Sequence, residues 1–142
     1  MTVINRSALV PYSARQMFEL VDGVEAYPEF LPWCSGVTVH ERSEDELCAT
    51  IEISKAGIHK AFTTRNRNQP YKMIEMRLVE GPFRHLEGFW RFDELGETAC
   101  KVSLDIEFEF SSRLLSMSLG PVFSQICNTL VEAFVQRARQ IY

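Results

Sequence analysis

Apolar and polar residues alternate along most of the middle of the chain. Between residues 100 and 110 every even position is apolar, whereas the odd positions carry Lys, Ser, Asp and Glu. The same alternation runs through 47–53, 74–78 and 86–92. A repeat of two is typical of a β-strand with one buried face and one face in water. Turn signals separate six candidate strands in the range 36–110, and they fall at 43–45, 56–57, 69–70, 81–82 and 95–96.

Two segments show a helical pattern instead. Ser13 and Gln16 have the spacing of a capping box, and apolar residues follow at helical intervals until Asp22-Gly23. Residues 113–142 repeat apolar side chains about every 3.6 positions, with an interruption at Gly120-Pro121. Because Pro121 has no N–H to donate, we expect either a kink there or a helix that begins at that residue.

One apolar sheet face and one long apolar helix bury their surfaces most simply against each other. Residues 3–10 are also compatible with a strand. The sequence therefore predicts an α+β fold, in which a curved antiparallel sheet of about seven strands wraps around the C-terminal helix. A bent sheet and a single helix seldom meet along their whole length, so we also expect a hydrophobic cavity between them. The length suits a single domain that spans residues 1–142.

The composition is that of an ordinary globular protein. Hydrophobic residues make up 46% of the chain, and the formal net charge of −4 argues against nucleic-acid binding through overall charge. The N-terminal residues lack the pattern of a signal peptide, and no uninterrupted apolar stretch reaches the length of a membrane span. The four cysteines are scattered without a CxxC pair, which favours reduced thiols. We therefore expect a cytoplasmic protein.

An aromatic segment bounded by prolines lies between the first helix and the central strands. Tyr27–Cys34 contains two prolines, which disfavour a long regular helix, and we interpret it as a lid over an apolar surface. Gly88 falls on the inward row of a strand, where it either leaves room for a ligand or allows a bulge or tight curvature. The candidate ligand-binding residues are Phe18, Tyr27, Phe30, Leu31, Trp33, Phe83, Leu86, Gly88, Trp90, Leu104, Ile106, Met117 and Val122. Tyr27 or Trp33 can donate a hydrogen bond to a polar head group at the mouth.

No constellation of catalytic or metal-ligating residues is visible in the sequence. His40, His59 and His85 stand far apart and lack metal-ligand spacing. Nucleophile and phosphate-loop motifs are absent. Asp105 and Glu107 share the outer face of one strand, where solvated carboxylates are more common than an acid/base pair. We expect a protein without a catalytic site, a bound metal or a required cofactor.

Basic residues are concentrated in one part of the chain. Residues 60–91 hold seven Lys and Arg against three acids. The alternation places four arginines on the outer face of neighbouring strands, namely Arg65, Arg67, Arg77 and Arg91. Two interpretations remain open. In the first, the arginines form cross-strand ion pairs with glutamates. In the second, they bind phosphates of RNA, or of lipid head groups during a transient contact with a membrane surface.

Four segments together resemble a known family, and they cover nearly the whole chain. They are Ser7-Ala-Leu-Val-Pro-Tyr-Ser-Ala14, Val24-Glu-Ala-Tyr-Pro-Glu-Phe-Leu-Pro-Trp-Cys34, Gly81-Pro-Phe-Arg-His-Leu-Glu-Gly-Phe-Trp90 and Gly120-Pro-Val-Phe123. These segments are similar to the coenzyme Q-binding START-domain family of the polyketide cyclase-like superfamily. The resemblance implies a helix-grip fold with a hydrophobic tunnel for ubiquinone-like isoprenoid lipids, in support of respiration. For the bacterial branch it also implies a toxin-like protein that binds the large ribosomal subunit and blocks subunit association.

Two functions of different classes therefore remain. A lipid-binding protein, with a ubiquinone-like lipid as its ligand, is favoured by the apolar sheet face and the aromatic lid. A translation inhibitor that binds the large ribosomal subunit is favoured by the resemblance and by the four outer-face arginines Arg65, Arg67, Arg77 and Arg91, which we call the basic stripe. An enzyme of the related cyclase type is the least favoured, because no acid/base set is visible.

Overall fold

A strand and three short helical segments precede six consecutive strands and a long helix in the computed structural model, which describes residues 1–142. The helical segments are α1 (Ala14–Asp22), the 3₁₀ turn η1 (Val24–Ala26), α2 (Tyr27–Phe30) and the long α3 (Arg113–Ile141). The strands are β1 (Thr2–Val10), β2 (Cys34–Arg42), β3 (Glu46–Lys55), β4 (Ile58–Gln69), β5 (Met73–Glu80), β6 (Phe83–Gly96) and β7 (Ala99–Phe110).

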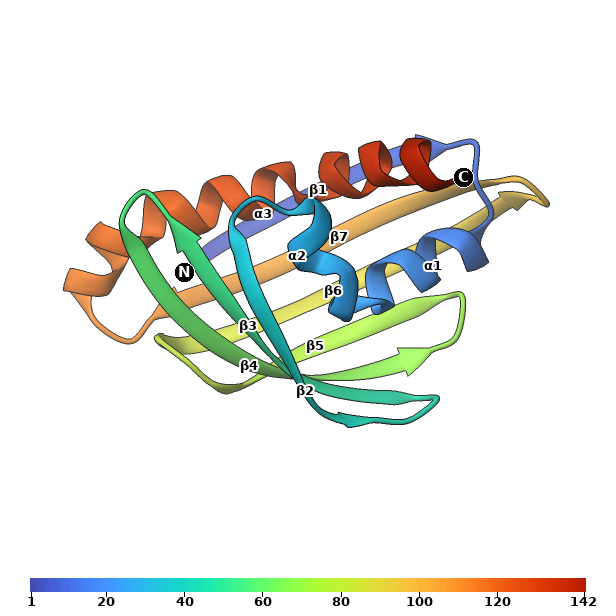
Figure 1. Cartoon of the computed structure of the whole chain (residues 1–142). Helices are drawn as coiled ribbons and strands as arrows, with labels where there is room; N and C mark the ends of the chain where they lie inside the picture. The colour runs from blue at the N-terminus through green and yellow to red at the C-terminus, as the bar shows by residue number, and fades with distance from the viewer.

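The seven strands form one antiparallel sheet in the order β1-β7-β6-β5-β4-β3-β2. Strands β2 to β7 are a meander of hairpins, whereas β1 pairs with the last strand and places Val10 opposite Cys100. Figure 1 shows α3 lying along β1 and β7, while β2 to β5 curl away beneath it. Register shifts place an extra residue in β2, β5 and β6, and β-bulges of this kind add local twist. The predicted α+β fold, a curved sheet around the C-terminal helix, is confirmed.

Helix α3 supplies one side of the hydrophobic core. It is continuous through Pro121 and begins at Arg113, where the Ser112 hydroxyl caps it by accepting from the Leu115 N–H at 3.1 Å. A helix that begins at Pro121 is therefore wrong. The proline is tolerated because the turn before it is largely exposed, so water can solvate the Met117 carbonyl that Pro121 leaves unpaired. By length and composition α3 could also cross a membrane; here it packs on the sheet as the core helix.

The segment between β1 and β2 folds back over the concave side of the sheet. The predicted capping box is present, because the Ser13 hydroxyl accepts from the Gln16 N–H at 3.0 Å and the Gln16 side chain accepts from the Ser13 N–H at 2.9 Å. The expected aromatic lid includes a short helix, α2, which has Pro28 in its first turn. Proline fits there because the first N–H groups of a helix have no intrahelical acceptor.

Candidate ligand-binding site

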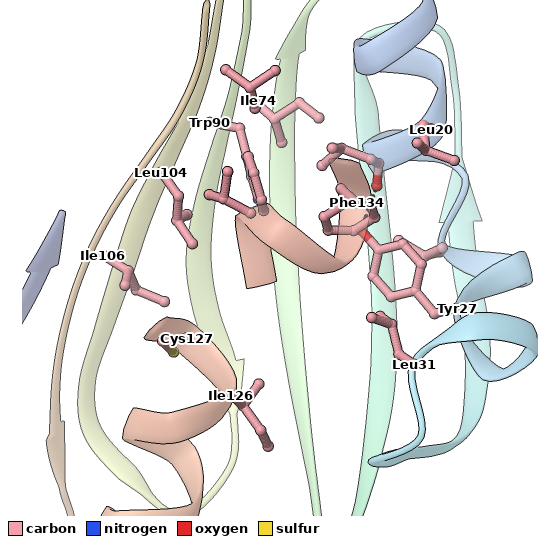
Figure 2. Close-up of a cluster of buried hydrophobic side chains, with 14 of the residues drawn as sticks. Leu20, Tyr27, Leu31, Ile74, Trp90, Leu104, Ile106, Ile126, Cys127 and Phe134 are labelled. Carbon is pink, nitrogen blue, oxygen red and sulfur yellow. Dashed lines mark hydrogen bonds between the residues drawn. The ribbon is translucent and has the colours of Figure 1, made fainter. Parts of the chain in front are cut away.

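A largely enclosed apolar cavity of about 70 Å³ lies between α3 and the concave face of the sheet. Strands β3 to β7 form one wall, α3 forms the other, and residues from η1 to Trp33 cover it. Figure 2 shows Leu104 and Ile106 on the sheet side, facing the part of α3 that carries Ile126 and Cys127. The lining residues are Val24, Tyr27, Trp33, Ile51, Phe62, Thr64, Asn66, Met76, Leu86, Gly88, Trp90, Leu104, Ile106, Phe123, Ile126, Cys127 and Leu130.

Gly88 lies at the floor of the cavity, opposite Met76 on β5 and Ile106 on β7. The register is unbroken on both sides, so the glycine does not mark a bulge. A Cβ placed there would lie 2.8 Å from Met76 Cε and 3.2 Å from the Asp105 carbonyl oxygen. The space that the missing side chain leaves is therefore occupied by the end of a methionine, which is a flexible filler.

Two aromatic clusters close the cavity at opposite ends of the α3 segment that lines it. At one end Phe134 lies 5.4 Å from Tyr27, 5.5 Å from Phe30 and 5.3 Å from Trp90, as ring-centroid distances. At the other end Phe123 lies 5.9 Å from Phe62, with further rings behind them, namely Phe83, Phe108 and Phe110. Edge-to-face packing of this kind fixes the rings and keeps water out.

Polar contacts hold the segment from α1 to α2 in place over the cavity. The Tyr27 hydroxyl donates to the Val21 carbonyl oxygen, and burial raises the pKa of this phenol. On β2, Arg42 donates to Asp22 at 3.1 Å and to Glu25 at 2.7 Å. These groups are partly exposed, so each ion pair adds little stability, but together they connect η1 to β2.

Trp33 forms the boundary between the cavity and the molecular surface. Its side chain lines the cavity on one side and, on the other, a surface groove of about 490 Å³ between α3 and the segment after α2. The other groove residues are Leu31, Pro32, Lys55, Asn128, Thr129, Glu132, Ala133 and Gln136. Trp33 is the one residue that lines both spaces, so its indole lies where they come together.

Replacing Trp33 with alanine should expose Cys127 to alkylation. The thiol lines the cavity, and burial raises its pKa to about 12, so almost none is thiolate at neutral pH. If water reaches the cavity, each unit by which this pKa falls increases the thiolate about tenfold. Peptide-resolved mass spectrometry after iodoacetamide treatment measures the rate.

Cys100 is the internal control for this experiment, because it is fully buried on β7 and does not line the cavity. The rate at Cys127 should rise while that at Cys100 stays constant. Equal acceleration at both thiols would mean that the substitution loosens the whole domain, and Trp33 would then not be a boundary.

The structure brings part of the predicted ligand-binding set together at the cavity. The residues that line it are Tyr27, Trp33, Leu86, Gly88, Trp90, Leu104 and Ile106. Phe30 and Phe83 lie one layer back, in the aromatic clusters. Leu31 is buried beside the groove, and Phe18 packs under α1 against Phe92 at 5.6 Å.

Two predicted residues of the C-terminal helix lie away from the cavity. Met117 is 70% exposed, because it stands two positions before the buried Leu119 and therefore on the outer side of α3. Val122 is partly buried but belongs to the neighbouring helical face. The α3 residues that line the cavity are Phe123, Ile126, Cys127 and Leu130. Helical periodicity identifies three of them as apolar-face residues, but it does not show which part of that face meets empty space.

Strand β4 supplies two lining residues that the sequence did not suggest, Thr64 and Asn66. They are 6% and 9% exposed, although polar residues on a strand usually face water. The signal lies in their neighbours. Arg65 and Arg67 alternate with them and occupy the outer face, which leaves the even positions inside.

The arginines of the basic stripe lie on the outer face of the sheet, and three have carboxylate partners. Arg65 reaches Glu41 at 3.0 Å, Arg67 reaches Glu46 at 4.0 Å, and Arg77 lies 2.8 Å from Glu75 and 3.5 Å from Glu87. Arg91 has no ion pair; its guanidinium lies 6.0 Å from the centre of the Phe89 ring. Cross-strand pairing therefore accounts for most of this stripe.

One cluster on the outer face has the composition of a metal site. His85, Glu87 and Glu107 place their ligand atoms within 4.8 Å of one another. His85 Nε2 is 3.0 Å from a Glu107 oxygen, and Glu87 is also paired with Arg77. All three side chains are partly exposed, and such groups are common without a metal. The cluster depends on the pairing of β6 with β7, so it is invisible in the linear spacing.

Comparison with known proteins defines the family. Residues 10–135 match the family described as polyketide cyclase/dehydrase and lipid transport, and the chain belongs to this family. A Pseudomonas aeruginosa relative named ribosome association toxin RatA is 50% identical over 99% of this chain and 98% of its own length. The mitochondrial coenzyme Q-binding protein coq10 of Schizosaccharomyces pombe is 27% identical over 94% of this chain and 84% of its own.

Solved structures share the fold at low sequence identity. A START superfamily protein from Mycobacterium smegmatis superposes with a TM-score of 0.82 at 18% identity and covers 99% of both chains. The Zhui aromatase/cyclase from Streptomyces sp. R1128 has a TM-score of 0.79 at 18% identity and covers 98% of this chain and 94% of that chain. The fold thus occurs in proteins named for different activities, and it does not by itself define a function.

Proposed function

We propose that the protein binds a hydrophobic small molecule, a ubiquinone-like isoprenoid lipid, between the sheet and α3. The observation that carries this proposal is the apolar cavity itself, in which 14 of 17 lining residues are hydrophobic. Each buried CH₂ of an isoprenoid chain contributes about 0.8 kcal/mol, so a few isoprene units give tight binding. The coq10 relative, named for coenzyme Q binding, supports the choice of ligand. The role is in the cytoplasm, in support of respiration, and it needs no cofactor.

Ligand binding requires the cavity to open. A volume of about 70 Å³ is less than half of the roughly 150 Å³ that holds one benzene molecule in an engineered protein cavity. A quinone ring with an isoprenoid tail therefore needs the space that Trp33 separates off, together with the space under Met76.

The chemistry of the lining favours binding over catalysis. Its titratable side chains are Tyr27 and Cys127. Burial raises the pKa of both groups, that of Cys127 to about 12, so neither exchanges a proton readily near neutral pH. General acid/base catalysis needs a group with a pKa close to the working pH. This supports a non-enzymatic role in a family whose description also includes cyclases.

Titration with decylubiquinone, a ubiquinone analogue with a saturated tail, tests the proposal. Both tryptophans, Trp33 and Trp90, line the cavity, so a bound quinone should quench the intrinsic fluorescence saturably. Mass spectrometry of an organic extract from natively purified protein then identifies any lipid carried from the cell. Linear, unsaturable quenching together with a lipid-free extract would rule out quinone binding.

The second candidate function is association with the large ribosomal subunit as a translation inhibitor. The observation that favours it is the 50% identity, over 99% of the chain, to a protein named ribosome association toxin. Phosphate contacts with ribosomal RNA would make such binding fall steeply with salt. Among the arginines of the basic stripe, Arg91 is the one without a carboxylate partner.

If this face of the sheet contacts ribosomal RNA, Arg91→Glu should weaken co-sedimentation with large subunits more than Arg77→Glu does. Arg77 already lies within 3.5 Å of two glutamates, so less of its charge is available to a phosphate. Sedimentation at increasing salt measures both variants, and the slope against salt should decrease for Arg91→Glu. Unchanged co-sedimentation for both variants would exclude the stripe from any ribosome contact.

A further inference from the structure

Strand β4 carries a row of three buried polar side chains on the face that is turned to the cavity. Thr64, Asn66 and Asn68 are 6%, 9% and 7% exposed, and they are the buried polar residues of the domain. A polar group removed from water destabilises the fold unless it finds a hydrogen-bond partner. The partners of this row therefore indicate which groups serve the fold.

The hydrogen bonds of the row leave two polar atoms without a partner, Asn66 Nδ2 and Asn68 Oδ1. Thr64 Oγ1 donates to Asn66 Oδ1 at 3.1 Å, and Asn68 Nδ2 donates to Asp22 Oδ1 at 3.0 Å. That bond to Thr64 is the one bond of the Asn66 side chain, so its Nδ2 has two uncommitted protons. Asn66 lines the cavity and Asn68 does not.

The other polar groups of the cavity are less suited to bind a ligand. The Tyr27 hydroxyl proton is committed to the Val21 carbonyl oxygen. The Trp33 indole N–H is free, but Trp33 also borders the surface groove, where water is available. Asn66 thus offers an uncommitted amide donor in a lining that is otherwise mostly apolar.

The surroundings of Asn66 can make room for a ligand. Asn66, Met76, Gly88 and Ile106 are successive partners across β4, β5, β6 and β7, so they form one rung of the cavity floor. The Met76 methyl group lies over Gly88, 2.8 Å from where a Cβ would stand. A rotation of this unbranched side chain would open space directly beside the Asn66 amide.

We propose that Asn66 Nδ2 donates a hydrogen bond to a carbonyl oxygen of a ligand whose body is otherwise apolar, with the ring of that ligand above Gly88. The assignment rests on the proposed lipid-binding function and makes it more specific. The ligand class is an apolar molecule with an acceptor oxygen on its ring, such as a quinone, and a pure hydrocarbon lacks this contact. Because Asn66 is only 9% exposed, few water molecules compete for this bond.

Two probes and two variants test this assignment. Decylubiquinone carries the acceptor oxygens, and decylbenzene has the same tail on a ring without oxygen and is measured by competition. Asn66→Leu, which has a similar volume, should weaken decylubiquinone binding about tenfold and leave decylbenzene binding unchanged or stronger. Asn68→Leu is the matched control, because it removes an amide of the same buried row that does not line the cavity. Its effect on decylubiquinone should be smaller than threefold, since it removes no direct contact with the probe.

Each outcome has a defined meaning. Equal weakening of both probes by Asn66→Leu, or no change in either, would overturn the role of Asn66 while leaving lipid binding in place. Preference of the unsubstituted protein for decylbenzene over decylubiquinone would also overturn it. Failure of the unsubstituted protein to bind either probe would instead contradict the proposed function. Binding of decylbenzene by Asn66→Leu shows in the same experiment that the variant is folded.

Discussion

Replacing Phe134 with alanine should lower the free energy of unfolding by about 3–5 kcal/mol. The Phe134 side chain is fully buried, and it contacts Tyr27, Phe30 and Trp90 at ring-centroid distances between 5.3 and 5.5 Å. Truncation removes the burial of a whole ring and leaves a void at the point where α2 meets α3. Urea denaturation followed by circular dichroism measures the loss.

Phe30→Ala is the matched control for this prediction. Phe30 belongs to the same cluster, but it is only partly buried, so its truncation should destabilise the domain clearly less than that of Phe134. An equal decrease in the free energy of unfolding for the two variants would mean that Phe134 contributes no more to the cluster than Phe30 does. A loss below about 1 kcal/mol for Phe134→Ala would contradict its place at the centre.

Filling the cavity should abolish ligand binding while the fold survives. Leu104→Trp introduces a ring into the cavity from a fully buried position on β7. The extra volume is comparable with the volume of the cavity, and overpacking of this kind destabilises a domain by about 1–3 kcal/mol. Saturable binding of decylubiquinone should disappear, whereas the circular dichroism spectrum should remain that of the unsubstituted protein.

Leu9→Trp is the control for the added indole, because Leu9 is 73% exposed on β1. This variant should bind decylubiquinone with unchanged affinity. If Leu104→Trp is folded and still binds the quinone as well as Leu9→Trp does, the ligand does not occupy the space beside Leu104. Gly88→Leu is a poorer choice for filling, because a Cβ at Gly88 already meets the Asp105 carbonyl oxygen at 3.2 Å.

The fold could be predicted from the sequence because most strands have one solvent-exposed face and one buried face. In β7 the alternation from Cys100 to Phe110 is unbroken, and the structure buries every second residue. Strand β4 lacks this signal, since Thr64, Asn66 and Asn68 are polar on the buried face as well. Its existence was predictable from the turns on either side, but the role of its inner face was not.

The candidate site was predictable where the alternation of side chains along a strand is enough to assign a residue to the inner face of the sheet. This rule is enough for Leu86, Trp90 and Leu104, which point inward whatever the curvature of the sheet. It fails on α3, because the helix presents a broad apolar face and only tertiary packing decides which part of that face meets a void. Met117 is a different case, since its position two residues before Leu119 already places it on the outer side of the helix.

Strand β1 is made first but can pair only after β7, the last strand, has been made. Thr2 pairs with Phe108 and Val10 with Cys100, and β1 has no other strand as neighbour. During synthesis this apolar segment therefore has no partner until β7 has been made, and such unpaired strands are prone to aggregate. Helix α3, which forms the opposite wall of the cavity, is made later still. The cavity between the sheet and α3 is therefore complete only once α3 has been made.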